Sequence, residues 1–344
     1  MFKKRSLATV VALALVAGLS ACDDDSDSTS PDAGTGTGGT PGTGGTPATG
    51  GTPGTGGTPG TGGAVALKDI VDTAAGNPEF SSLVAAVQKA ELVTTLKGAG
   101  PFTVFAPTNA AFTALLASLN TNLDGLTKEA LTPILTYHVV SGKVQAADVV
   151  GLKVAKTVNG ADFRIKVDAG KVFLTAGNGA DIQVTMTDIQ ATNGVIHVIN
   201  KVMLPPKDIA GVAAANPDFS ILVQALTRAN LVDAVKAPGP LTVFAPTNAA
   251  FAKLLATNAA WMSINDVPLE TLTAVLKYHV VATKAYSETV VTLPKVTTLL
   301  GKDVTIAVNA GAVKLNGTTN VTAVDVLASN GVIHVLDNVL LPPN

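Results

Sequence analysis

The sequence is poor in cysteine and in aromatic residues. Cys22 is the single cysteine among 344 residues, and Phe, Trp and Tyr together make up 4% of the chain. One cysteine cannot form an internal disulfide, and its position leaves the rest of the chain without a thiol for catalysis or metal binding. With so few aromatic rings, the cores must be built mainly from Val, Leu, Ile and Ala.

Beyond the N-terminus the chain also lacks an apolar run long enough to cross a membrane. Residues 1–22 have the features of a lipoprotein signal peptide: basic residues at 3–5, an apolar run at 7–19, and a Leu-Ser-Ala-Cys lipobox at 19–22. We predict cleavage before Cys22 and attachment of membrane lipid to its thiol. The alternative is an ordinary secretory signal with a stray cysteine.

Neither sign of charge is in excess after this N-terminal region. Positions 3–5 hold three of the 23 basic residues, and five of the 25 acidic residues are aspartates between positions 23 and 32. From residue 64 onward, 20 of each sign remain. Nucleic-acid-binding proteins need a basic footprint, so nucleic acid is excluded as a partner.

Residues 23–63 are acidic at first and then repeat Gly, Thr and Pro in a GTGGTP pattern. Such a segment cannot bury enough apolar surface to fold, and Gly-rich chain behaves as a flexible coil. We therefore predict a disordered tether over these residues.

The rest of the chain contains a long internal repeat. TVFAPTNAAF occurs at 103–112 and again at 242–251. Four further blocks recur in the same order: Asn-Pro-acidic-Phe at 77–80 and 216–219, Tyr-His-Val-Val at 137–140 and 278–281, NGVIHV at 193–198 and 330–335, and Leu-Pro-Pro at 204–206 and 341–343. A period this long indicates a duplicated domain, because solenoid units are much shorter. We predict domains at 64–206 and 207–344.

Within each repeat, helical periodicity comes first and strand-like alternation later. In the first repeat we expect helices near 67–74, 83–87, 112–119 and 127–137, and an alternating strand at 163–167. Thr108 is placed to cap the third helix. The predicted buried set includes Leu67, Leu119 and Val167. Helices followed by strands indicate an α+β fold.

These blocks resemble the fasciclin domain family, and the resemblance covers both repeats nearly end to end. It rests on TVFAPTNAAF, the Tyr-His pair, and the NGVIHV strand that runs into Leu-Pro-Pro. It implies two tandem fasciclin-type domains, each a wedge-shaped β-sandwich with helices along one side. It also implies adhesion and matrix contact rather than a reaction. The sequence departs from the family at Asn109 and Ala111, where an acidic residue is usual.

All four histidines lie in the repeated blocks, but they lack the close spacing of a metal site, so we predict no metal or cofactor. His197 and His334 lie in apolar strands, and we interpret them as core histidines hydrogen-bonded to backbone. No nucleophile motif, P-loop or dinucleotide fingerprint appears. We predict no catalytic residues and no enzyme activity.

Two sets of residues are candidates for binding. The family links the Tyr-His pair first to domain integrity and second to adhesion; here the pair is Tyr137-His138 and Tyr278-His279. Some animal fasciclin domains contact integrins through an Asp-Ile pair before the NGV strand. Asp188-Ile189 and Asp325-Val326 occupy that position. The alternative is that the apolar residue packs and the aspartate faces solvent.

The sequence therefore predicts a lipid-anchored bacterial envelope protein, on the outer membrane or cell surface rather than the inner membrane. Its domains would adhere to a surface, matrix or protein partner. One rival function is glycan binding, which predicts an exposed aromatic platform; Trp261 and Tyr286 are unique to the second repeat. Another is a structural or signalling partner inside the periplasm. Whether the domains self-associate weakly is left open.

Overall fold

The computed structural model describes residues 66–177, 179–309 and 311–343. These residues fall into one compact unit that contains both repeats. The predicted signal peptide at 1–22, the lipid-bearing Cys22 and the tether at 23–63 lie outside the described residues. They remain predictions, as do the domain limits of 64–206 and 207–344.

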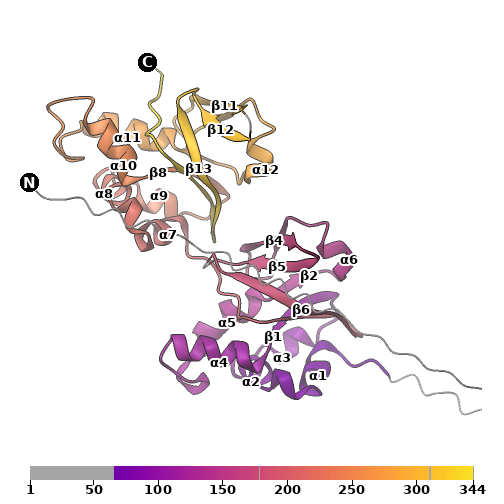
Figure 1. Ribbon diagram of the computed structural model, residues 1–344. Coiled ribbons are helices and arrows are strands. Elements are labelled where there is room, and N and C mark those ends of the chain that lie inside the picture. Colours follow the sequence, from indigo (N-terminus) through magenta and orange to yellow (C-terminus); the bar gives the residue numbers. More distant parts are fainter. Residues whose placement is uncertain (1–65, 178, 310, 344) are drawn as a thin grey trace, which may run out of the picture. The chain divides into compact units, whose positions relative to one another are not determined.

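The first domain begins with helices and ends with strands (Figure 1). Its helices are α1 (Ile70–Ala75), η1 (Pro78–Phe80), α2 (Ser81–Lys89), α3 (Val93–Leu96), α4 (Asn109–Ser118), η2 (Leu123–Gly125), α5 (Lys128–Tyr137) and α6 (Ala146–Val149). Its strands are β1 (Phe102–Pro107), β2 (Val139–Ser141), β3 (Val154–Lys156), β4 (Asp162–Asp168), β5 (Lys171–Thr175), β6 (Asp181–Ala191) and β7 (Gly194–Ile199).

These strands hydrogen-bond in the order β2-β1-β7-β6-β5-β4-β3, which gives seven strands within the described part of the domain. β1 runs parallel to β7, with Phe102 opposite Gly194, and the other pairs are antiparallel. β6 belongs to both halves of the sheet, because its start pairs with β5 and the rest pairs with β7. Register shifts between Val184 and Ile189 mark irregularities of the kind that bend a strand.

The second domain repeats this plan. Its helices are α7 (Ile209–Ala215), η3 (Pro217–Phe219), α8 (Ser220–Arg228), α9 (Val232–Lys236), α10 (Asn248–Leu255), α11 (Leu269–Tyr278) and α12 (Ser287–Val290). Its strands are β8 (Leu241–Pro246), β9 (Val280–Val281), β10 (Lys295–Thr297), β11 (Asp303–Asn309), β12 (Ala312–Leu315), β13 (Thr319–Ala328) and β14 (Gly331–Leu336). The strand order is β10-β11-β12-β13-β14-β8-β9, with β14 parallel to β8. The α+β prediction is confirmed.

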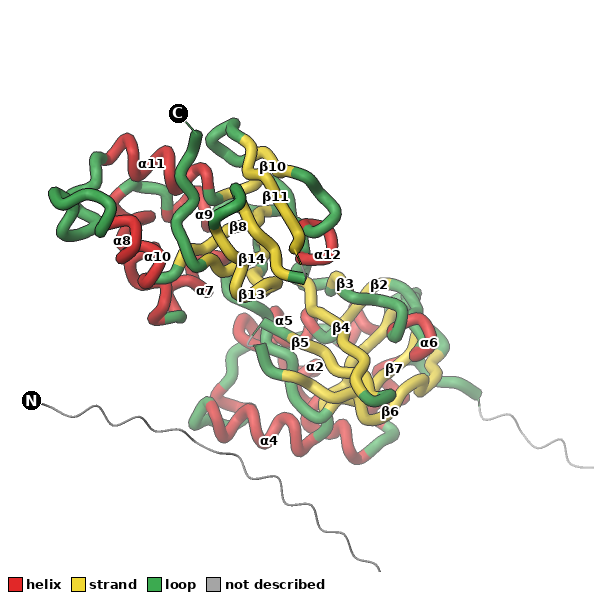
Figure 2. The backbone as a smooth tube through the Cα atoms, turned by 45° about the horizontal axis from the view of Figure 1, so that its top comes forward, coloured by secondary structure: helices red, strands yellow, loops and turns green. Residues whose placement is uncertain are grey.

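The longer helices of each domain gather beside the sheet, while the short α6 and α12 lie toward its other side (Figure 2). This arrangement gives each domain two cores. In the first domain, Val104 of β1 packs with the helices, whereas its neighbour Phe105 packs with strand residues such as Phe163. Adjacent residues face opposite sides of a strand, so β1 contributes to both cores. The rings of Phe105 and Phe163 meet edge to face at 5.2 Å.

A threonine side chain caps the start of α4 and of its second-domain counterpart α10. The Thr108 hydroxyl accepts a hydrogen bond from the N–H of Ala111 at 3.3 Å, which confirms the predicted cap of α4. Thr247 does the same for α10 in the second domain. Asn109, where the family usually has an acid nearby, accepts from the N–H of Ser82 at the start of α2.

Three predicted core residues are wrong. Leu67 is 57% exposed, Leu119 is 48% exposed and Val167 is 46% exposed. Leu67 precedes α1 and Leu119 follows α4, so neither lies on the helix face that its spacing suggested. Val167 is near the end of β4, beyond the part that the cores cover. Periodicity identified these elements correctly and misplaced their ends by a few residues.

Within the described ranges, no single helix is long and apolar enough to span a membrane. One pair of segments, Ile209–Ala215 and Pro217–Arg228, meets the length and composition criteria together but bends by 108° between them.

Candidate binding site

The Tyr-His pair lies inside the first domain. The Tyr137 hydroxyl donates to the backbone oxygen of Asp162 at 2.8 Å. His138 Nε2 accepts from the N–H of Met203 at 2.9 Å, so the proton is on Nδ1, which lies 2.8 Å from the Ile134 oxygen. Burial lowers the pKa of His138 to about 4 and raises the pKa of Tyr137. The pair is neutral and fully hydrogen-bonded.

The second domain has the same arrangement. The Tyr278 hydroxyl donates to the backbone oxygen of Asp303 at 2.7 Å and accepts from Asn316 Nδ2 at 3.0 Å. His279 Nε2 accepts from the N–H of Leu340 at 2.9 Å, and its Nδ1 lies 2.7 Å from the Val275 oxygen. Burial lowers the pKa of His279 to about 4.

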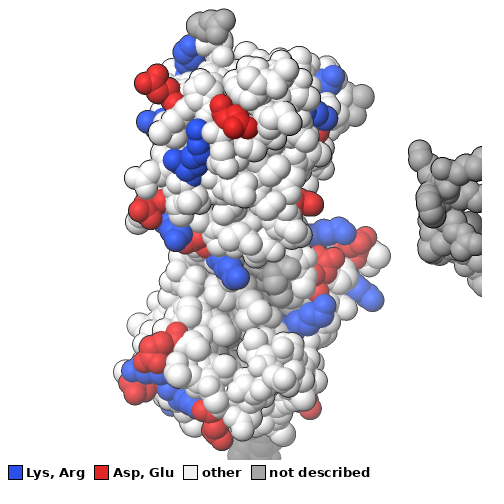
Figure 3. Space-filling view, turned by 90° about the vertical axis from the view of Figure 1, so that its left-hand side faces the viewer, with Lys and Arg blue, Asp and Glu red and all other residues white. Residues whose placement is uncertain are grey.

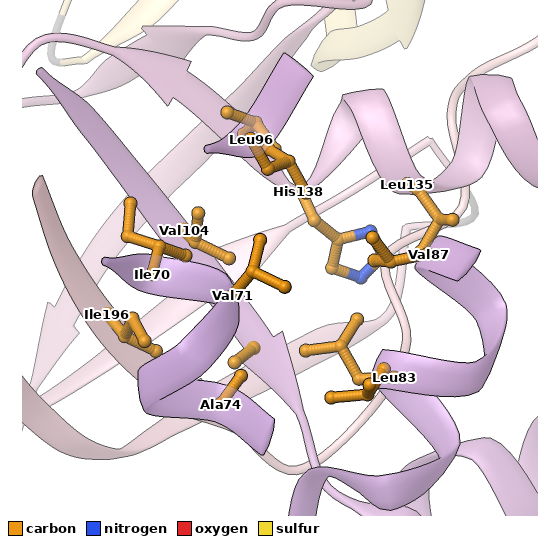
Figure 4. A pocket seen from close by; sticks show the side chains of 13 residues that line it. Ile70, Val71, Ala74, Leu83, Val87, Leu96, Val104, Leu135, His138 and Ile196 are labelled. Carbon is orange, nitrogen blue, oxygen red and sulfur yellow. The ribbon is translucent and has the colours of Figure 1, made fainter. Parts of the chain in front are cut away.

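Next to His138 is a small apolar cavity between the helices and the sheet (Figure 4). Its volume is about 30 Å³, and Val71, Leu83 and Val104 are among the residues that line it. A corresponding cavity of about 20 Å³ lies beside His279. Ligand sites have volumes of roughly 300 Å³ or more. These cavities are therefore packing voids.

The strand histidines also have structural roles. His197 Nε2 lies 2.8 Å from the backbone oxygen of Val144, and its Nδ1 accepts from the N–H of Asp188 at 3.3 Å. His334 makes the equivalent contacts with Ala285 at 2.9 Å and Asp325 at 3.4 Å. Both imidazoles are buried. The prediction of core histidines hydrogen-bonded to backbone is confirmed.

Asp188 and Asp325 both adopt a left-handed backbone conformation, with φ of 61° and 60°. In the first domain, Asp188 Oδ1 accepts from the N–H of Ala146 at 3.0 Å, and its side chain is half-buried. Ile189 packs against the first core. Among the described residues, Asp188 forms no salt bridge.

Asp325 has a different environment. Its carboxylate accepts from the N–H of Ser287 at 2.7 Å and also contacts the Ser287 hydroxyl. Arg164 Nη1, which comes from β4 of the first domain, lies 3.1 Å from Asp325 Oδ2. Only 6% of the Asp325 side chain is exposed. Val326 packs against the core of the second domain.

The Arg164–Asp325 pair belongs to a larger polar cluster, which we call the domain seam. Its members are Asp162 and Arg164 of the first domain and Lys284, Tyr286, Glu288 and Asp325 of the second. Arg164 Nη2 hydrogen-bonds Glu288, and its guanidinium carbon lies 5.4 Å from the centroid of the Tyr286 ring. Asp162 Oδ2 accepts from the Tyr286 hydroxyl at 2.6 Å and from Lys284 Nζ at 3.1 Å.

The seam also alters the ionisation of its members. The Arg164 guanidinium lowers the pKa of Glu288. Burial, together with the hydrogen bond to the Asp162 carboxylate, raises the pKa of Tyr286. The seam therefore favours the charged form of Glu288 and the neutral form of Tyr286.

The described part of the chain contains no group of three or more His, Cys, Asp or Glu side chains that could hold a metal ion. The fasciclin domain model matches residues 78–205 and 217–342, which is most of the chain. The chain belongs to the fasciclin domain family. Fasciclin domains are associated with cell adhesion and protein interaction.

Relatives of this fasciclin protein come from bacteria and animals. Synechocystis protein sll1483 is 50% identical over 138 residues, which cover 40% of this chain and 73% of that protein. Human periostin is 28% identical over 260 residues, covering 72% of this chain and 29% of periostin. The immunogenic protein MPB70 of Mycobacterium bovis is 38% identical over 138 residues, 39% of this chain and 67% of MPB70.

The solved structures similar to this fasciclin protein include a FAS1 domain pair from the insect cell adhesion molecule Fasciclin I, with 19% identity and a TM-score of 0.39. The similarity covers 75% of this chain and 92% of that one.

The prediction that the Tyr-His pairs are binding residues is wrong, because both pairs are buried. Tyr137, His138, Tyr278 and His279 are at most 2% exposed, and every polar side-chain atom among them is hydrogen-bonded. They cannot touch a partner while their domain is folded. The interpretation of aspartates facing solvent is also wrong for Asp325, which the seam encloses.

Most of the seam was missed by sequence reasoning. Nothing in the sequence singled out its charged members Asp162, Arg164, Lys284 and Glu288, and Tyr286 stood out only because it is unique to the second repeat. Arg164 and Glu288 are 124 residues apart, and no periodic pattern links them. The face in Figure 3 shows why charge alone gave no signal: small groups of both signs are scattered among larger uncharged areas.

Proposed function

We propose that this protein is a lipid-anchored cell-envelope adhesion protein whose two fasciclin domains bind a surface, matrix or protein partner. Lipid on Cys22 would hold it at the outer membrane or cell surface of a bacterium, and residues 23–63 would separate the domains from the lipid. The association of fasciclin domains with adhesion supports this function. The balanced charge of the domains favours a partner other than nucleic acid.

One observation carries the choice of binding site: the two Asp positions have different environments. Asp325 is enclosed and neutralised by Arg164. Asp188 is half-buried without an ion pair in the described residues, and Met186 beside it on β6 is 58% exposed. A carboxylate next to an exposed apolar side chain suits a partner that offers a basic group with an apolar stem. We therefore place the adhesive contact at Asp188 and Met186 of the first domain.

The glycan-binding rival loses its main support. Trp261 packs partly against the core of the second domain, and the Tyr286 hydroxyl is bonded to Asp162. Neither ring is free to form the exposed platform that sugar binding would need. The remaining alternative function is a structural or signalling role inside the periplasm. It differs from adhesion in the compartment where the domains lie.

Protease treatment of intact cells separates these two roles. If the protein is displayed outward, protease removes the domains from whole cells. If the domains stay protected until the envelope is opened, the adhesive function is wrong and a periplasmic partner takes its place.

Attachment of cells to surfaces coated with their own extracellular matrix tests the site. Asp188→Asn keeps the side-chain shape and the oxygen that accepts from Ala146, and it removes the charge. We expect attachment to fall several-fold. Asp181→Asn is the matched control, because Asp181 is an exposed carboxylate at the start of the same strand. Equal attachment by both variants and the unmodified protein would exclude the Asp188 site.

A further inference from the structure

Four of the charged side chains in the domain seam are largely withdrawn from water, while the fifth, Glu288, is 45% exposed at its rim. The exposed fractions are 21% for Arg164, 18% for Lys284, 11% for Asp162 and 6% for Asp325. Each charged group in it has a partner of opposite sign: Arg164 with Glu288 and Asp325, and Lys284 with Asp162. Enclosed pairs of this kind interact more strongly than surface ion pairs, which contribute little.

Hydrogen bonds that recur in both domains identify the counterpart of each seam residue. The tyrosine of the Tyr-His pair donates to Asp162 in the first domain and to Asp303 in the second, so these two aspartates correspond. Two residues after each of them, Arg164 therefore corresponds to Thr305. The strand histidine contacts Val144 in the first domain and Ala285 in the second. Val144 therefore corresponds to Ala285. One residue further on, Gln145 corresponds to Tyr286, and three residues further on, Ala147 corresponds to Glu288.

Three of the six seam residues, Arg164, Tyr286 and Glu288, differ in type from their counterparts in the other repeat. The first domain has the arginine but lacks the aromatic ring and the glutamate that receive it. The second domain has the ring and the glutamate but has Thr305 where the arginine would be. Asp162, Asp325 and Lys284 keep their types at the counterpart positions Asp303, Asp188 and Lys143. The donor face, which carries the arginine, therefore occurs only in the first domain. The acceptor face, which carries the aromatic ring and the glutamate, occurs only in the second.

We infer that the seam holds the two domains in one fixed arrangement, with the first domain docked on the second, and that this contact cannot be extended to another copy. A head-to-tail contact, in which the donor face of one copy meets the acceptor face of the next, would generate rings or open chains. Here the single donor face and the single acceptor face meet within one molecule. Buried polar pairs fix orientation more than they add stability, because desolvation offsets much of their attraction. The seam therefore fixes the orientation of the two domains relative to each other. This role is separate from the binding of any partner.

Electron spin resonance distance measurements test this inference on the full chain. Cys22→Ser removes the native thiol, and nitroxide labels are attached at Ala114→Cys on α4 and Thr271→Cys on α11. Both positions are exposed and lie outside the seam. We expect one narrow distance distribution. Arg164→Ala should broaden it roughly twofold, since domains without a strong interface move relative to each other by default.

Lys166→Ala is the matched control, because Lys166 lies two residues along the same strand and its ion pair with Asp168 is local and exposed. It should leave the distribution unchanged. A second variant, Tyr286→Phe, removes the bond to Asp162 from the other domain and should also broaden it, so the result does not depend on how well Arg164→Ala folds. The inference is overturned if the unmodified distribution is broad, or if the seam variants match Lys166→Ala.

Discussion

The imidazole of His138 accepts a hydrogen bond from the backbone N–H of Met203, 65 residues further along the chain. This bond ties the end of α5 to the segment that follows β7. His279 makes the same connection to Leu340 in the second domain. In each domain the Tyr-His block is therefore connected to the residue directly before the Leu-Pro-Pro block.

Acidification should destabilise both domains through these histidines. Their folded-state pKa of about 4 lies below the usual value of about 6.5. Between these pH values the unfolded chain binds more protons, so the free energy of unfolding falls as the pH falls from 6.5 to 4. Protonation of Nε2 would place two N–H groups against each other at Met203 and at Leu340. We expect a loss on the order of 3 kcal/mol for each histidine.

Urea unfolding at a series of pH values, followed by circular dichroism, measures this effect. Carboxylates also titrate near pH 4, so the informative comparison is with His138→Gln and His279→Gln. Each variant should be less stable at pH 7 and show a shallower dependence between pH 6.5 and 4. An unchanged slope in both variants would show that the histidines do not carry the effect.

Tyr137→Phe should lower the free energy of unfolding by about 1–2 kcal/mol, because it leaves the buried oxygen of Asp162 without this donor. Tyr278→Phe should cost more, since the Tyr278 hydroxyl also accepts from Asn316. Chemical denaturation of the two variants gives the comparison. A larger loss for Tyr137→Phe would contradict the hydrogen bonds described.

Asn193→Ala should destabilise the first domain by about 2–4 kcal/mol. The Asn193 side chain accepts from the N–H of Ile70 at 2.9 Å and donates to the oxygens of Leu96 and Gly98 at 2.8 and 2.9 Å. It is 8% exposed, so its removal leaves backbone groups unpaired away from water. The denaturation midpoint reports the loss. Asn159→Ala is the control, because it removes one 3.3 Å bond and should cost less than about 1 kcal/mol.

A protein with a donor face added to its second domain and an acceptor face added to its first should polymerise. Thr305→Arg adds a donor to the second domain, and Gln145→Tyr with Ala147→Glu adds an acceptor to the first. The triple variant should form concentration-dependent head-to-tail chains in sedimentation experiments, while the unmodified chain sediments as a single copy. The variant with Thr305→Arg alone is the control and should not form chains. A triple variant that remains a single copy would count against the role given to these three positions.

The parts of the structure that could be predicted from sequence are those with a local or repeated signal. The duplication identified two α+β domains, Thr108 was recognised as a helix cap, and apolar strands indicated buried histidines. The ends of elements could not be predicted, because an apolar residue such as Leu119 continues a helical pattern after the helix has ended. The seam could not be predicted either, since Arg164 and Asp325 carry no pattern until folding brings them together.

The parallel pairing of β1 with β7 has a consequence for synthesis. Phe102 lies opposite Gly194, so β1 lacks its β7 neighbour until the chain has grown almost to the end of the first domain. At about 5–20 residues per second, the wait is on the order of 5–20 s. During that interval the edge of β1 that will receive β7 is open to chaperones or to misplaced strands. The nascent chain is most vulnerable to aggregation at this stage, well before the second domain emerges from the ribosome.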